Sequence, residues 1–284
     1  MTAINLPLIF LKSALNFTNR KEDDLRFYLS ATIHFRIDRV NNRLNMTASN
    51  GYMAALWSLT HSDSYEKYPL FEVSNESDHS LDFIDFSITI DKSLAYSINA
   101  LRRLKSDKAR SLVQINTEKG TIQYLDTLIN YTKLANDDNV NYSKVFKVMT
   151  PNDMTCLSDT HKHVDITTLI DPIQSEINKT FDLKYLLDMS EAIHALRNYS
   201  TGQAIKQEYF NLAIEHPELT GGIGRVYFSS DDFLAYRKAA GDAAVKPDFA
   251  VEFFAVIMPV CLHDKGQCAV NTRKDYQKFV DFFK

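Results

Sequence analysis

The chain has 284 residues, of which 45% are hydrophobic and 24% charged, and its formal net charge is −4. Its 8 glycines and 7 prolines exclude collagen-like and low-complexity chains, and its apolar fraction excludes global disorder. No apolar run approaches the roughly 20 residues that span a bilayer, the N-terminus lacks a secretory pattern, and three scattered cysteines predict a reducing, cytoplasmic location.

The first half of the chain predicts one order of elements twice. In the first copy, apolar side chains at helical spacing predict a helix over residues 6–17, with Lys12 exposed between them. Alternation of apolar and polar residues then predicts three strands joined by tight turns, over 27–37, 44–48 and 52–59.

The second copy begins after a polar, acidic loop with an edge segment over 60–85. A short strand over 86–90 precedes Asp91, a suitable N-cap for a helix that runs to about residue 106. Three further strands are predicted over 112–117, 121–125 and 128–134. Because strand, helix and three strands occur twice in about 148 residues, the order indicates an internal structural repeat.

A third copy follows a poorly patterned stretch over 149–178. Its predicted elements are a strand over 180–183, a helix through about residue 198, and strands near 209–215, 224–229, 233–238 and 249–260. A tail over 263–284 ends in an amphipathic pattern that predicts one further helix.

Five motifs together carry a family resemblance. They are RFYL (26–29), TASNGYMA (47–54), VNYSKV (140–145), FDLKYLLD (181–188) and VIMPV (256–260). In this order they resemble the RYYL-type strand, ATDGHRLA-type turn, PDYRRV-type segment, FNVSYVLDV-type start and VVMPM-type final strand of the bacterial DNA polymerase III sliding clamp (beta subunit). The resemblance covers residues 25–148 and 180–262.

The resemblance implies an α+β DNA-clamp fold with repeated β-α-β-β-β half-domains, antiparallel sheets and helices on one face. It implies a clamp domain over residues 1–148, a second, partly degenerate clamp domain over 149–262, and a C-terminal extension over 263–284. The family's first domain has no counterpart in the sequence, and 149–179 corresponds to a shortened half-domain. Because those two regions close the family's ring, ring closure is an open question for this chain.

The function implied by the resemblance is that of a processivity factor, which tethers DNA polymerase or other proteins to duplex DNA through a peptide-binding pocket. Neither catalysis nor a cofactor is expected. A clamp loader and further copies of the chain are candidate partners, and no contact with a membrane is expected. The alternative is an adaptor or inhibitor that binds clamp-binding peptides without encircling DNA.

The resemblance also implies which residues line the peptide pocket. They mix aliphatic, aromatic and methionine side chains, which suit an adaptable groove. The matching positions are Leu29, Ser49, Gly51, Tyr52, Met53, Ala54, Val140, Lys144, Val145, Asp182, Tyr185, Val256, Ile257, Met258, Pro259 and Val260. For the apolar strand residues among them, burial in an ordinary core is the alternative.

One helix region concentrates basic residues, which would suit non-specific contact with DNA phosphates. Against a single acid, Asp107, it carries Lys92, Arg102, Arg103, Lys105, Lys108 and Arg110. The alternative is that these side chains complement the helix dipole and solvate the surface.

Two remaining motifs have a weaker chemical meaning. QKFVDF (277–282) resembles the Q-x-x-L-x-F peptide with which polymerases bind clamps, so the tail is a candidate to dock in a pocket; an amphipathic helix packed on the body is the alternative. Cys156, His161 and His163 suggest zinc or a Cys–His pair, but no fourth ligand lies nearby, so we expect no metal site.

Overall fold

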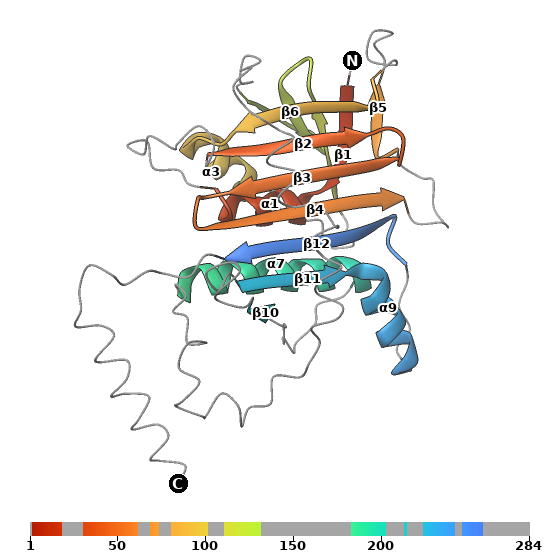
Figure 1. The fold of residues 1–284 in the computed structure, drawn as a ribbon. Helices are drawn as coiled ribbons and strands as arrows, with labels where there is room; N and C mark the ends of the chain where they lie inside the picture. Colours follow the sequence, from red (N-terminus) through yellow and green to blue (C-terminus); the bar gives the residue numbers. More distant parts are fainter. Residues whose placement is uncertain are drawn as a thin grey trace, which may run out of the picture.

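The computed structural model describes residues 2–18, 31–61, 69–73, 81–101, 111–131, 183–202, 213–214, 224–241 and 246–257. These residues form two sheets, all of whose strand pairs are antiparallel, together with helices that pack against them (Figure 1). The predicted α+β class is therefore confirmed. Among the described helices, none combines the length and the apolar character needed to cross a membrane.

The first copy of the repeat contains one more strand than its residues predict. Its elements are β1 (Thr2–Pro7), α1 (Leu8–Asn16), β2 (Thr32–Asp38), β3 (Arg43–Ser49) and β4 (Met53–His61). The sequence does not separate β1 from α1, because Ala3 to Leu6 are buried on both faces of the strand and so show no polar alternation.

The second copy repeats this order after a short edge strand, β5 (Phe71–Val73). Its elements are β6 (Phe83–Thr89), α3 (Lys92–Ala100), β7 (Leu112–Asn116), β8 (Thr121–Tyr124) and β9 (Thr127–Asn130). The Leu94 N–H donates to the Asp91 carboxylate over 2.7 Å, as expected of an N-cap. The helix ends at Ala100 and not near residue 106, because Leu101 adopts an extended backbone (φ −59°, ψ 120°).

The two copies exchange their first strands. β1 lies in the five-stranded sheet of the second copy, whose order is β5-β1-β7-β8-β9, and β6 lies beside β2 in the sheet of the first copy. Equivalent backbone bonds close both exchanges: Leu8 N–H donates to Ser111 C=O over 2.8 Å, and Ile90 N–H to Ala31 C=O over 2.7 Å. The repeat therefore has an approximate twofold symmetry.

The third stretch extends the sheet of the first copy. It contributes α7 (Leu183–Thr201), β10 (Ala213–Ile214), β11 (Gly224–Ser229), α9 (Ser230–Ala239) and β12 (Phe249–Ile257). The resulting seven-stranded sheet has the order β10-β11-β12-β4-β3-β2-β6 (Figure 1). One strand prediction is wrong, because residues 233–238 are helical. Of the strand predicted over 180–183, only Leu183 is among the described residues, and it begins α7.

Local signals explain why residues 233–238 form helix α9. The Ser229 hydroxyl accepts a hydrogen bond from the Asp232 N–H over 3.3 Å, so it caps the helix. The first turn carries Asp231 and Asp232 and the last carries Arg237 and Lys238, which is the charge order that a helix dipole favours. These capping and charge signals outweigh the short alternation that predicts a strand.

The two sheets and three of the helices share one apolar core. Trp57 is fully buried at its centre and lies edge-on to Phe17, with a centroid distance of 5.5 Å, and 5.1 Å from the ring of Phe253. Lys12 is half-buried, not exposed as predicted, because its Nζ donates to the Asn99 and Leu101 carbonyls at the end of α3.

Candidate functional site

The main candidate site lies where β4 begins and β12 ends. The two strands pair antiparallel over their whole length, from Phe249 opposite His61 to Ile257 opposite Met53. Ala54 and Val256 stand opposite each other and are both half-buried. This pairing brings a turn of the first copy next to the end of the last described strand.

A polar turn holds Tyr52 outward at this point. The Asn50 side-chain oxygen accepts hydrogen bonds from the Tyr52 and Met53 N–H groups, both over 2.9 Å, and the Ser49 hydroxyl accepts one from the Gly51 N–H over 3.2 Å. Gly51 has φ +88°, a conformation that favours glycine. The loop is therefore fixed by its own side chains, and Tyr52 is 50% exposed.

Helix α7 brings a second aromatic ring to the same place. The rings of Tyr52 and Tyr185 are stacked, with centroids 5.7 Å apart and an interplanar angle of 16°. Leu183 and Leu187, in the same first turns of α7, are 69% and 56% exposed. The leucines lie two residues from Tyr185 on either side, so they face away from it around the helix. The junction itself presents a stacked aromatic pair, with Tyr52 exposed and Tyr185 half-buried, which suits an apolar anchor of a peptide.

Half of the predicted pocket residues fall on this junction. They are Ser49, Gly51, Tyr52, Met53, Ala54, Tyr185, Val256 and Ile257. Met53 and Ile257 are buried in the core, so they form the floor beneath the junction and offer no surface to a ligand. The other predicted positions lie outside the described residues: Leu29, Val140, Lys144, Val145, Asp182, Met258, Pro259 and Val260.

The predicted DNA-facing residues are mostly beyond the part of the chain that the structure describes. Lys92 is exposed in the first turn of α3, whereas Arg102, Arg103, Lys105, Lys108 and Arg110 lie outside it. Helix α3 contacts α1, and α1 contacts α7. Apart from half-buried Lys12, α1 carries no charged side chain.

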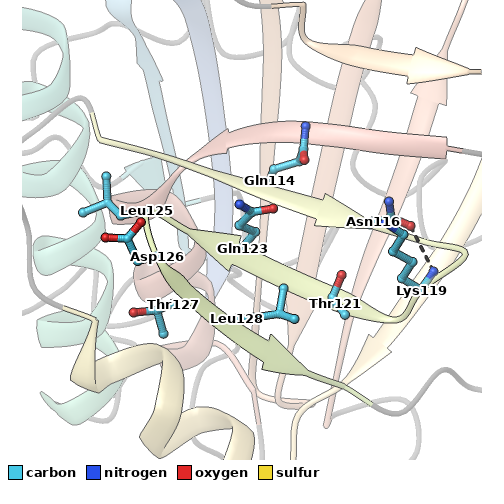
Figure 2. Close-up of a pocket in the computed structure, with 9 residues that line it drawn as sticks. All are labelled: Gln114, Asn116, Lys119, Thr121, Gln123, Leu125, Asp126, Thr127 and Leu128. Carbon is cyan, nitrogen blue, oxygen red and sulfur yellow. Dashed lines mark hydrogen bonds between the residues drawn. The ribbon is translucent and has the colours of Figure 1, made fainter.

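A second hollow, which the sequence analysis did not predict, lies on the outer face of the five-stranded sheet (Figure 2). It has a volume of about 470 Å³ and is lined by Gln114, Asn116, Lys119, Thr121, Gln123, Leu125, Asp126, Thr127 and Leu128. Gln114 lies opposite Gln123, and Gln123 opposite Leu128, so one row of side chains crosses three strands. The sequence signal for this face is the alternation of outward glutamines with apolar residues in the strands.

Chemical groups suited to catalysis are scarce in the described residues. Nowhere in the described ranges do three or more His, Cys, Asp or Glu side chains cluster as metal ligands would. Cys156, His161, His163 and the QKFVDF segment (277–282) lie outside these ranges. His34 contacts the hydroxyls of Thr32 and Ser87 at 2.9 Å each, but it is only 3% exposed, so no substrate reaches it.

The two large pKa shifts also have structural causes. Burial raises the pKa of Tyr131 to about 12. Burial raises the pKa of Tyr227 to about 12 as well, and the charges of Glu252 and Asp232 act in the same direction. Neither tyrosine lies at the junction of β4 and β12.

Neither a protein-family model nor a curated protein matches the chain. Among solved structures, it is similar to the Helicobacter pylori beta clamp in complex with 5-chloroisatin, with 14% identity and a TM-score of 0.30 over 48% of this chain and 31% of the clamp. The Helicobacter pylori clamp bound to a DNA ligase peptide has 13% identity and a TM-score of 0.30, over 48% of this chain and 32% of the clamp. The Bacillus subtilis DNA polymerase sliding clamp has 9% identity and a TM-score of 0.33, over 49% of this chain and 32% of the clamp. The chain thus covers about a third of each clamp's length.

Proposed function

We propose that this protein is a sliding-clamp-like scaffold that tethers DNA polymerase or other proteins to duplex DNA by binding a short peptide segment of each partner. The observation that carries the proposal is the stack of exposed Tyr52 on half-buried Tyr185, at the junction where half of the expected pocket residues meet. That junction joins elements from distant parts of the chain.

The chemistry of the junction fits a peptide with apolar anchors. Stacked tyrosines offer large, rigid apolar faces, and their hydroxyl groups tolerate water at the rim. A peptide of the Q-x-x-L-x-F kind carries leucine and phenylalanine anchors, which are the apolar groups that such aromatic faces bind.

The DNA-binding part of the proposal rests on the basic residues that follow α3. A set of lysines and arginines without a matching set of acids would attract phosphates without reading bases. Exposed Lys92 marks the start of this basic region.

The peptide site is tested by fluorescence polarisation with a labelled Q-x-x-L-x-F peptide. Tyr185→Ala and Tyr52→Ala each remove one stacked ring and should weaken binding at least about tenfold, as expected for an aromatic hot spot. Tyr236→Ala is the matched control, because Tyr236 is 70% exposed on α9 and outside the junction. Equal affinities for all three variants and the unmodified protein would refute the site.

One observation favours a second candidate, an adaptor that binds peptides without encircling DNA. Among the helices that lie side by side, α1 has a single cation, Lys12, and that cation binds the end of α3. Retention on circular duplex DNA separates the two functions. A DNA tether should be retained and should lose retention when Arg102, Arg103 and Lys105 are all replaced by Glu, whereas an adaptor should never be retained.

A further inference from the structure

The hollow on the outer face of the five-stranded sheet is separate from the junction of β4 and β12. All of its lining residues belong to β7, β8, β9 and the two turns between these strands. It lies along β8, between the β7–β8 turn at one end and the β8–β9 turn at the other (Figure 2). Its volume of about 470 Å³ falls within the range of sites that bind small ligands, which is about 300–1,000 Å³.

The two ends of the hollow carry opposite charges, and each charge lies in a fixed turn. At one end, the Asn116 side-chain oxygen accepts a hydrogen bond from the Lys119 N–H over 2.9 Å. At the other end, Tyr124 pairs with Thr127, so Asp126 lies in a two-residue turn. Both charged side chains are exposed, and neither forms an ion pair within the described ranges. A ligand therefore meets a positive charge at one end and a negative charge at the other.

Side-chain amides lie between the two charged ends (Figure 2). Gln114 of β7 stands opposite Gln123 of β8, and both line the hollow. Neither amide has a hydrogen-bond partner among the residues that the structure describes. Each offers N–H donors and a C=O acceptor, which match the N–H and C=O groups of a peptide backbone. Leu128 of β9 is 61% exposed and adds an apolar wall against which an aliphatic side chain can pack.

The spacing of the two charges sets the length of the ligand. The four residues of β8 rise about 10 Å from the first Cα to the last, and Lys119 and Asp126 lie just beyond the two ends of the strand. An extended peptide of three or four residues spans about 10–14 Å, so its α-carboxylate and α-ammonium groups can reach both charges. Asp126 would repel a polyphosphate chain, and a neutral sugar would leave both charges without a partner.

We propose that this hollow binds a free peptide of three or four residues, extended along β8, with its α-carboxylate at Lys119 and its α-ammonium at Asp126. The free termini supply both charges without any particular side chain, so the site selects its ligand by length and by unblocked ends. Because both charges of the site are exposed, the expected dissociation constant is on the order of 1 mM. The proposal does not depend on the peptide site at the junction of β4 and β12.

Tetra-alanine with free termini is the probe for this site, because its small side chains leave recognition to the backbone and the termini. Titration of the full chain, followed by nuclear magnetic resonance, should shift the side-chain amide signals of Gln114 and Gln123 until they saturate. Blocking both termini, as in N-acetyl tetra-alanine amide, should weaken binding about fivefold or more. Equal binding of the free and blocked peptides, or no binding of the free peptide up to about 20 mM, would overturn the proposal.

Peptides that are blocked at one end test the orientation. N-acetyl tetra-alanine keeps only its carboxylate, so Lys119→Met should weaken its binding about threefold, whereas Asp126→Asn should not weaken it. Tetra-alanine amide keeps only its ammonium group, so the effects of the two substitutions should be reversed. Lys238→Met, at an exposed lysine of α9, is the matched control for the loss of a surface charge. Losses that do not separate in this way, or that Lys238→Met reproduces, would contradict the proposed orientation.

Discussion

The two copies of the repeat have the same order of elements but very different surroundings. In the first, α1 lies between α3 and α7, and β4 has a strand on each side. In the second, α3 exposes Lys92 and Tyr96, and β9 has one neighbour among the described strands. The same β-α-β-β-β unit thus forms the interior in one place and a surface in the other. The position of each copy within the fold, and not the order of its elements, decides which side chains stabilise the protein.

The two copies should differ most in the free energy of unfolding that is lost when a large side chain in the last strand of each is replaced by alanine. Trp57→Ala opens a cavity beside Phe17 and Phe253 and should lower the free energy of unfolding by about 3–5 kcal/mol. Leu128→Ala in β9 should change it by less than about 0.5 kcal/mol, because the side chain is largely exposed. Urea unfolding measures both free energies. Similar losses in the two variants would contradict the contrast.

The next largest difference is expected between Lys12 of α1 and Lys92 of α3, in their contribution to the free energy of unfolding. Lys12→Met removes a charged donor from the last carbonyls of α3, so we expect a loss of about 1–2 kcal/mol. Lys92→Met, at an exposed position in the first turn of α3, is the matched control and should lower the free energy of unfolding by less than about 0.5 kcal/mol. If both variants unfold at the same urea concentration, Lys12 does not fasten α1 to α3.

The smallest effect concerns Tyr131, which follows β9. Its hydroxyl donates to the Asn116 carbonyl over 3.2 Å, and burial raises its pKa from 10.0 to about 12. The raised pKa means that its stabilisation is complete below pH 10 and is lost as the pH rises from 10 towards 12. Between about pH 9 and pH 11, the free energy of unfolding should therefore fall by about 1 kcal/mol less in Tyr131→Phe than in the unmodified protein. Parallel unfolding curves for the two proteins would exclude this cause.

Most of the fold follows from the sequence where local signals are strong. The alternation in β2, β3 and β4 and the Asp91 cap predict elements that the structure contains. The prediction fails for β1, because a strand buried on both faces looks like part of the following helix. It also fails for α9, where the cap and end charges are the better signals.

The candidate site is less accessible to sequence reasoning. The TASNGYMA turn (47–54) can be recognised from its Asn-Gly pair, but no local pattern shows that Tyr52 stacks on Tyr185. That contact depends on the pairing of β4 with β12, which is a long-range event. The hollow beside β9 was missed because outward glutamines are ordinary features of a half-solvated strand.

The exchanged first strands have a consequence for how the chain folds. Ala3 pairs with Asn116, so neither sheet is complete until residues from both copies have met. Such distant pairings give a high contact order, and a high contact order slows folding because long loops must close first. During synthesis, β1 must wait for β7 to emerge, and β4 must wait for β12. A ribosome-bound chain that ends after the first copy therefore exposes unpaired strand edges, and chaperones that shield such edges should determine its yield.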